Sequence, residues 1–158
     1  MTDLRFGLGF DVHPRGDASP LMLGGVPFEE EPRLEGHSDA DVVCHAVADA
    51  FLGAAAQGDL GTHFPDDDPG IAGVGGLDLL GRVVALIRGL GFHPTSCDVV
   101  VLAERPPIAP RRDEIRGNLA GVLGVPMDRI SVKATRPEGM GLSGDGAACF
   151  ALAVASVS

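Results

Sequence analysis

The order of strand-like and helix-like segments restricts the fold of this 158-residue chain more than any other feature. Apolar and β-branched runs predict strands over residues 4–13, 21–28, 97–104, 129–135 and 147–158. Helical spacing of apolar side chains predicts helices over residues 42–51, 76–91 and 109–124. The order β-β-α-α-β-α-β-β indicates a sandwich of the α/β or α+β class. We expect one α+β domain over residues 1–158, a mixed β-sheet with its helices packed on one face.

The first strand carries two polar side chains near its end, Asp11 and His13. Residues at i and i+2 of a strand point to the same face, so the two side chains either meet water or hold a ligand. We expect this strand to form a hairpin with residues 21–28, across the turn-rich residues 14–20. The fragment "GLGFDV" is not a dinucleotide-binding motif, because the third glycine is missing and no helix follows.

Charge excludes one class of partner. The chain has 12 Lys and Arg against 22 Asp and Glu, a formal net charge of −10, and it lacks the clustered basic residues that nucleic acids need. An anionic substrate would therefore need a divalent metal to neutralise its charge.

Three cysteines, Cys44, Cys97 and Cys149, form no CxxC pair and are expected to be reduced and buried. The N-terminal residues do not resemble a signal peptide and no apolar run could span a bilayer, so we expect a cytoplasmic protein with no membrane partner. Glycine-rich apolar strands with few aromatic residues suggest that part of the sheet is buried against another copy.

The first predicted helix has Asp41, His45 and Asp49 on one face. If the helix is considered alone, the simplest interpretation is that this face is polar and exposed to solvent. Together with Asp11 and His13, however, His45 would complete a set of two imidazoles and one carboxylate. Such a set leaves a coordination position open, as catalytic zinc sites do. Both interpretations are open from residue types alone.

Three further segments could bind ligand. Ser38 is expected to cap the first helix, with Asp41 three residues on, and the free N–H groups of its first turn could receive a phosphate. Asp66 to Asp68 could hold a cation or substrate hydroxyls, or could be a solvated loop. The segment "VKATRPEGMG" offers Lys133, Arg136 and Glu138 for phosphate and metal.

With "GFDVHP", "LEGHSDADVVCHAVADAFLGAAAQGDLGTHFPDDDP", "AERPPIAP" and "VKATRPEGMGLSGDG" in this order, the chain resembles the 2-C-methyl-D-erythritol 2,4-cyclodiphosphate synthase family nearly end to end. The resemblance implies a lyase of non-mevalonate isoprenoid (terpenoid) biosynthesis. It would convert 4-diphosphocytidyl-2-C-methyl-D-erythritol 2-phosphate into the cyclic diphosphate and CMP. The 2-phosphate would attack the β-phosphate, so no protein nucleophile is required.

The resemblance also assigns residues. Asp11, His13 and His45 match zinc ligands, and Glu138 matches the ligand of a magnesium or manganese ion that bridges the diphosphate. His37 and Ser38 match the residues that contact the 2-phosphate end of the substrate, and His37 and Arg136 match the two positions that stabilise the transition state. The remaining substrate-binding positions, from the methylerythritol part to the cytidine, match Asp59, Leu60, Gly61, Phe64, Pro65, Asp66, Asp67, Asp68, Ala103, Glu104, Arg105, Pro106, Pro107, Ile108, Ala109, Ala134, Thr135, Pro137, Leu142 and Asp145. In the family the cytidine pocket belongs to a neighbouring chain, which implies a homotrimer with its sheets facing inward.

Four positions depart from the family pattern. Arg136 replaces a threonine, Pro107 a lysine, Asp145 an arginine and Leu142 a phenylalanine. We hypothesise that Arg136 supplies part of the positive charge lost at Pro107 and Asp145, because a guanidinium binds phosphate bidentately. Two other functions stay open: a zinc-dependent phosphohydrolase that activates water, and a catalytically weakened trimer that binds nucleotide.

Overall fold

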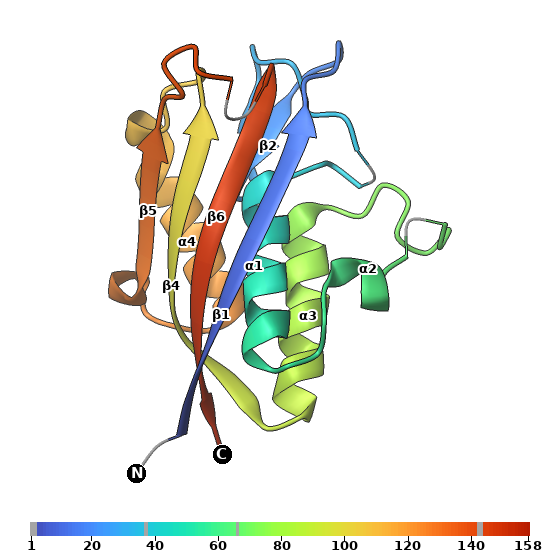
Figure 1. Cartoon of the computed structure of the whole chain (residues 1–158), viewed down its shortest axis with the longest axis vertical. Coiled ribbons are helices and arrows are strands. Elements are labelled where there is room, and N and C mark those ends of the chain that lie inside the picture. The colour runs from blue at the N-terminus through green and yellow to red at the C-terminus, as the bar shows by residue number, and fades with distance from the viewer. Residues whose placement is uncertain (1–2, 37, 66, 142–143) are drawn as a thin grey trace.

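The computed structural model describes residues 3–36, 38–65, 67–141 and 144–158. Its main layer is a four-stranded mixed sheet in the order β1-β6-β4-β5, built from β1 (Asp3–Pro14), β6 (Gly146–Val157), β4 (Phe92–Ala103) and β5 (Ile130–Thr135). Three helices, α1 (Val42–Ala54), α3 (Gly76–Gly89) and α4 (Arg112–Leu123), lie on one side of this sheet (Figure 1). The predicted α+β arrangement with helices on one face is confirmed.

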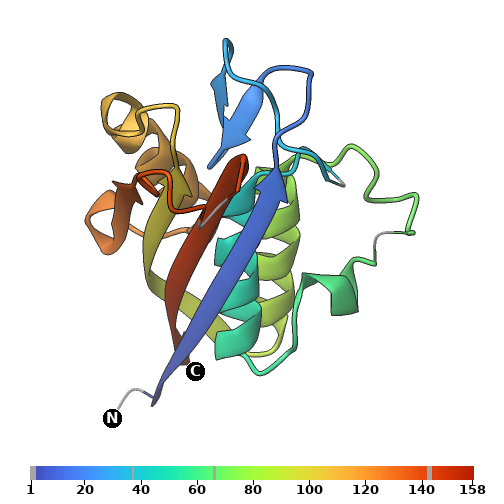
Figure 2. The ribbon, with the colours of Figure 1, turned by 45° about the horizontal axis from the view of Figure 1, so that its top comes forward.

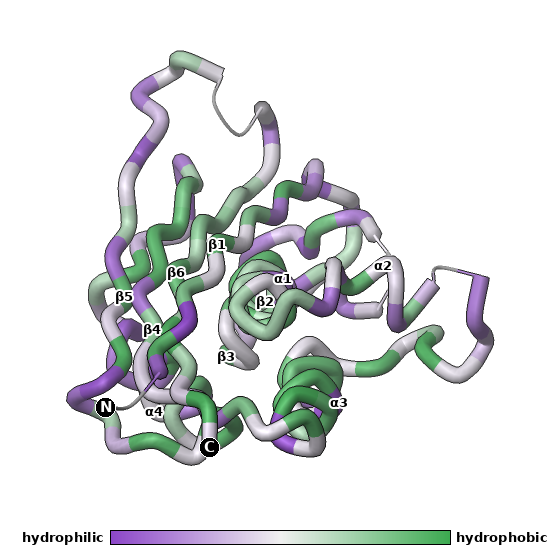
Figure 3. The backbone as a smooth tube through the Cα atoms, turned by 60° about the horizontal axis from the view of Figure 1, so that its bottom comes forward, coloured by the Kyte–Doolittle hydropathy of each residue, from purple (hydrophilic) through white to green (hydrophobic). Residues whose placement is uncertain are grey.

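Helix α1 lies between the sheet and α3, and its residues are hydrophobic around most of its circumference (Figure 3). Ten of its residues are buried, which fits a helix enclosed on two sides. Its contact with β1 is unusually close because Gly7 and Gly9 carry no side chain. A Cβ atom at Gly9 would lie 1.9 Å from the carbonyl oxygen of Ala46, and one at Gly7 would lie 1.8 Å from that of Ala50. These glycines therefore let the helix backbone rest directly on the strand.

The predicted hairpin between the first strand and residues 21–28 is wrong. Strand β1 pairs instead with β6, antiparallel over its whole length. Residues 21–28 form a hairpin of their own, β2 (Leu21–Leu23) and β3 (Val26–Phe28), which stands beyond the end of β1 in Figure 2. The physical reason is the Gly24–Gly25 pair, whose φ values of 58° and 72° suit a tight two-residue turn that splits the run in two.

The connections follow ordinary capping rules. Gly91, with φ 85°, ends α3 as predicted, and Gly124, with φ 68°, ends α4. Strand β4 begins at Phe92, five residues before the predicted start, and residues 109–111 form a 3₁₀ turn ahead of α4. The loop predicted after α1 contains a single helical turn, α2 (Leu60–His63).

The N-terminus of α1 differs from the prediction in a way that affects the site. Asp41, not Ser38, is the N-cap, and its Oδ1 accepts the N–H groups of Val43 and Cys44. Asp41 is wholly buried, so the expected solvated face is wrong at this position, and its two oxygens also accept the N–H groups of Gly24 and Gly25. The N–H groups of Val43 and Cys44 in the first turn of α1 therefore already have an anionic partner and are not free to receive a phosphate.

The sheet face away from the helices is apolar and exposed. Side chains of β1 and β6 on this face are 42 to 71% exposed, namely Leu4, Phe6, Leu8, Phe10, Val12, Phe150 and Leu152. The rings of Phe10 and Phe150 pack with centroids 4.6 Å apart. A contiguous apolar face of this kind marks an interaction surface.

The three cysteines are free and buried, as predicted. Among the helices that the structure describes, none combines the length and the apolar character needed to cross a membrane.

Candidate active site

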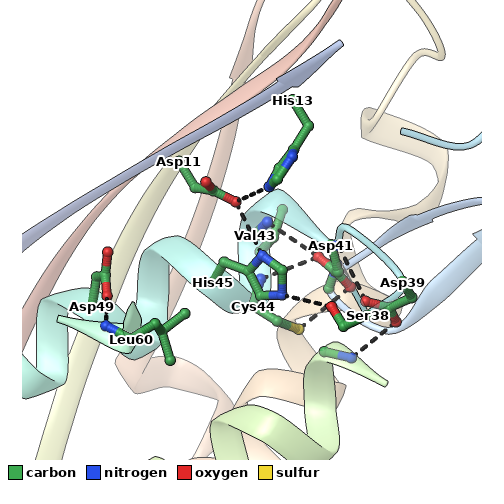
Figure 4. Close-up of polar contacts among 12 residues, drawn as sticks. Asp11, His13, Ser38, Asp39, Asp41, Val43, Cys44, His45, Asp49 and Leu60 are labelled. Atoms are coloured by element: carbon green, nitrogen blue, oxygen red, sulfur yellow. Dashed lines mark hydrogen bonds and ion pairs between the residues drawn. The ribbon is translucent and has the colours of Figure 1, made fainter. Parts of the chain in front are cut away.

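Asp11, His13 and His45 meet where the end of β1 passes over α1 (Figure 4). Oδ2 of Asp11 lies 3.0 Å from Nε2 of His13 and 3.1 Å from Nδ1 of His45. One ligand atom from each residue lies within 4.8 Å of the other two, and no other group of His, Cys, Asp and Glu in the described residues has this geometry. The alternating faces of β1 bring the first two residues together, and the close packing of α1 supplies the third.

The charge of the Asp11 carboxylate suits a cation. Burial by itself raises the pKa of Asp11. Hydrogen bonds with His13 and His45 oppose this effect and together outweigh it, so the pKa is lowered to about 2. The carboxylate is therefore ionised throughout the neutral range. Two imidazoles and an ionised carboxylate are a donor set typical of catalytic zinc, so these residues fit the expected metal.

Ser38 lies beside this group. Its hydroxyl is 3.2 Å from Nε2 of His45, on the side of the ring opposite Asp11. The backbone of Ser38 is in the left-handed region, with φ 59°, and so is that of Ala40, with φ 53°. Non-glycine residues in this region cost free energy and cluster at functional sites.

A pocket opens over the three candidate metal ligands. Four residues that we expect to bind substrate line it, namely Ser38, Leu60, Gly61 and Phe64. Sequence reasoning missed four more lining residues, Asp49, Ile71, Val74 and Leu79. The helical spacing of Asp49 from His45 was a usable signal for the first of these, whereas the other three are apolar residues that carry no chemical signature.

A second cavity, of about 190 Å³, lies at the opposite edge of the sheet, near the ends of β4 and β5. Six of the predicted nucleotide-binding residues line it: Ala103, Pro106, Pro107, Ile108, Ala109 and Ala134. Arg136 lines it too, although it was predicted as a transition-state stabiliser, and Arg112 was missed. This cavity shares no lining residue with the pocket over Asp11, His13 and His45.

The other predicted residues do not line either cavity. Asp59 caps α2, Asp68 accepts the N–H of Gly70, and Glu104 accepts the N–H of Gly139. The remaining residues of this set are Pro65, Asp67, Arg105, Thr135, Pro137, Glu138 and Asp145. His37, Asp66 and Leu142 lie outside the described residues.

Comparisons with known proteins agree with the geometry. The sequence profile of the YgbB family matches residues 4–158. The chain is 51% identical over 150 residues to 2-C-methyl-D-erythritol 2,4-cyclodiphosphate synthase from Symbiobacterium thermophilum, covering 94% of this chain and 96% of the relative. It is also 50% identical over 151 residues to the bifunctional enzyme IspD/IspF of Desulforudis audaxviator. This match covers 96% of this chain and 38% of the relative.

Solved structures give the same result. One structure of 2C-methyl-D-erythritol-2,4-cyclodiphosphate synthase superposes with a TM-score of 0.89 at 30% identity, covering 96% of this chain and 99% of that one. The bifunctional IspDF from Campylobacter jejuni superposes with a TM-score of 0.94 at 34% identity, covering 100% of this chain and 43% of that one. A structure of the synthase with CDP bound superposes with a TM-score of 0.88 at 30% identity, covering 96% of this chain and 99% of that one.

Proposed function

The chain belongs to the YgbB family and has the activity of a 2-C-methyl-D-erythritol 2,4-cyclodiphosphate synthase, and from this premise we propose how its residues divide the reaction. The reaction converts 4-diphosphocytidyl-2-C-methyl-D-erythritol 2-phosphate into the cyclic diphosphate and CMP, a step of isoprenoid precursor biosynthesis. An oxygen of the 2-phosphate forms a bond to the β-phosphorus, and the bond from that phosphorus to the oxygen that leaves with CMP breaks. Every bond formed or broken belongs to the substrate, so the protein acts by positioning and by charge.

The observation that carries the proposal is the convergence of Asp11, His13 and His45 in one pocket. These residues would hold a zinc ion, which when bound polarises a β-phosphate oxygen as a Lewis acid. The apolar wall formed by Leu60, Phe64 and its neighbours would hold the methylerythritol part and exclude water. Glu138 would supply a carboxylate to a magnesium or manganese ion on the diphosphate, since such ions commonly bind through one carboxylate plus substrate phosphates.

The direct test is incubation of the protein with the substrate, zinc and magnesium, followed by phosphorus NMR. We expect a cyclic diphosphate and CMP. A linear phosphate product would instead show a zinc-dependent phosphohydrolase, and tight CDP binding without turnover would show a weakened nucleotide-binding protein.

We also propose that the working unit is a homotrimer with the cytidine cavity contributed by a neighbouring chain. Two observations support it. The metal pocket and the cytidine cavity lie at opposite edges of the sheet, and the apolar face of β1 and β6 has no covering element within the described part of the chain.

Leu8, 71% exposed at the centre of that face, provides a test. We expect Leu8→Asp to convert a trimer into monomers and to abolish activity, because a buried unpaired carboxylate opposes association. Leu90→Asp is the matched control, since Leu90 is 50% exposed at the end of α3, away from this face. Light scattering after gel filtration measures the result, and a Leu8→Asp protein that stays trimeric would contradict the proposal.

Arg136 provides a second test. It lines the cytidine cavity and makes no ion pair with any residue that the structure describes, so its charge is available to substrate. We expect Arg136→Thr to weaken substrate binding roughly 10-fold, the effect of one lost charge-assisted hydrogen bond. Arg129→Ala, at an exposed arginine outside the described cavities, should change nothing. Unchanged substrate affinity and CMP release in Arg136→Thr would refute the idea that Arg136 compensates for Pro107 and Asp145.

A further inference from the structure

Residues 104–109, which we call the cytidine loop, form one wall of the cytidine cavity. Apart from Arg112 and Arg136, the side chains that line this cavity are those of alanine, proline and isoleucine, which have no polar atom. A nucleobase presents both donors and acceptors, and arginine side chains can only donate. Within one chain, acceptors for a nucleobase must therefore come from the backbone around the cavity, so the position of the cytidine loop decides how well a nucleotide fits.

The start of the cytidine loop has little backbone hydrogen bonding of its own. Pro106 and Pro107 have no N–H group. In the part of the chain that the structure describes, residues 104–107 take part in none of the hydrogen bonds between backbone groups of turns and loops. The carbonyl oxygen of Arg105 instead accepts from Nη2 of Arg15, 90 residues earlier in the sequence. A distant side chain thus holds the backbone of the loop.

Arg15 is itself held in a defined position. Its side chain is 6% exposed, and its Nη1 donates to the carboxylate of Glu31 and to the carbonyl oxygen of Pro32, each at 3.3 Å. Its backbone N–H donates to the carbonyl oxygen of Asp145 at 2.8 Å. Burial lowers the pKa of Arg15, which shows that its surroundings disfavour the charge and that these contacts must offset the cost. The guanidinium therefore has a fixed place from which Nη2 reaches the loop.

Glu31 joins the two arginines. Its Oε2 lies 3.3 Å from Nη1 of Arg15 and 3.6 Å from Nη1 of Arg105. The side chain of Arg105 is 57% exposed, and an ion pair with an exposed partner contributes little. The bond from the enclosed guanidinium of Arg15 to the Arg105 carbonyl is charge-assisted and shielded from water, so it is the stronger restraint.

The topology explains how Arg15 comes to lie beside this loop. Strands β1 and β4 both pair antiparallel with β6, so their C-terminal ends lie at the same end of the sheet (Figure 1). Arg15 comes directly after β1, two residues beyond the candidate metal ligand His13, and the cytidine loop comes directly after β4. The chain that leaves the metal-binding strand therefore also contacts the cytidine loop.

We propose that Arg15 is a positioning residue for nucleotide binding, which fixes the cytidine loop in the conformation that receives the cytidine part of the substrate. The inference rests on the proposed function of the cytidine cavity. Without Arg15 the loop would be ordered only when the nucleotide binds, and this ordering reduces affinity. The contact between the Glu104 carboxylate and the N–H of Gly139, at 2.8 Å, remains, so the loop would be loosened and not released.

The test compares one ligand that contains the nucleotide with one that lacks it. Binding of CDP is measured by calorimetry, and the cyclic diphosphate product is measured as an inhibitor. We expect Arg15→Ala to weaken CDP binding and to raise KM roughly 10-fold, the effect of one lost charge-assisted hydrogen bond. Both kcat and inhibition by the cyclic product should stay within about two-fold of the wild type, because the metal pocket keeps all its residues.

Arg15→Lys is a second variant that keeps the positive charge beside Glu31. A single ammonium group does not replace the separate Nη1 and Nη2 donors, so this variant should bind CDP with an affinity between those of the wild type and Arg15→Ala. If Arg15→Ala does not fold, Arg15→Lys allows the same comparison of CDP with the cyclic product.

Arg116→Ala is the matched control. Arg116 also donates to one carboxylate and two backbone carbonyls, those of Asp113, Met127 and Ile130, but it lines neither the metal pocket nor the cytidine cavity. In thermal unfolding it should lose stability as Arg15→Ala does, while its CDP affinity stays that of the wild type.

Unchanged CDP binding in the Arg15 variants, or equal losses for CDP and for the cyclic product, would overturn the role of Arg15. Failure of the wild-type protein to bind CDP would refute the proposed cytidine cavity instead, so the two failures are distinguishable.

Discussion

His45→Ala should lower kcat by at least about 10³-fold and remove the bound zinc. A zinc site with three protein ligands loses most of its affinity with one of them, and Lewis-acid stabilisation of the transition state contributes several kcal/mol. Two measurements check this prediction: kcat from a steady-state assay, and the number of zinc ions bound per chain. His93→Ala is the control, because His93 is exposed on β4 and, within the described structure, its ring forms a hydrogen bond only with the Ser158 hydroxyl.

The same variant distinguishes a metal role from a packing role. If His45→Ala keeps one zinc per chain and loses activity only through instability, the metal assignment is wrong. Asp11→Asn gives an independent check. The amide keeps the volume of the side chain but removes its negative charge, which the low pKa of Asp11 maintains at neutral pH in the wild type. Both variants should lose zinc while the control keeps it.

Gly9→Ala should destabilise the protein by at least about 3 kcal/mol, an effect of severe overpacking. The added methyl group would lie 1.9 Å from the carbonyl oxygen of Ala46 and 2.7 Å from the nitrogen of Ala50. Both contacts are with helix backbone, which no side-chain rotation relieves, so α1 must move away from β1. Since α1 carries His45 and β1 carries Asp11, activity should fall along with stability.

Gly121→Ala is the matched control for this prediction. Gly121 is an exposed residue of α4, and a Cβ atom there would have no heavy atom within 4 Å beyond the neighbouring backbone of its own helix. Alanine is a better helix former than glycine, so this change should stabilise the protein by about 0.5 to 1 kcal/mol. Urea unfolding measures both variants, and a Gly9→Ala protein as stable as the wild type would contradict the close packing of α1 on β1.

Part of this site could be predicted from sequence because its residues have local signals. Asp11 and His13 alternate on a strand and His45 has helical spacing, so residue types and periodicity by themselves restrict how these side chains can be arranged. The convergence of the three depends on Gly7 and Gly9, and the sequence shows these only as gaps in an apolar strand. The distance between strand and helix is a tertiary property that no local pattern contains.

The errors have physical causes as well. The Gly24–Gly25 turn divides a run that is apolar enough for one strand, and only the φ values reveal it. Asp41 rather than Ser38 caps α1 because its carboxylate also receives two N–H groups from that turn, a contact 16 to 17 residues away in sequence.

The most direct test of this account is anomalous X-ray diffraction at the zinc edge from crystals grown with zinc. We expect one anomalous peak per chain, within bonding distance of Oδ2 of Asp11, Nε2 of His13 and Nδ1 of His45, with an open position facing the pocket. No peak at these three residues, or a peak at a different set of ligands, would contradict the central claim that they form the metal centre of the enzyme.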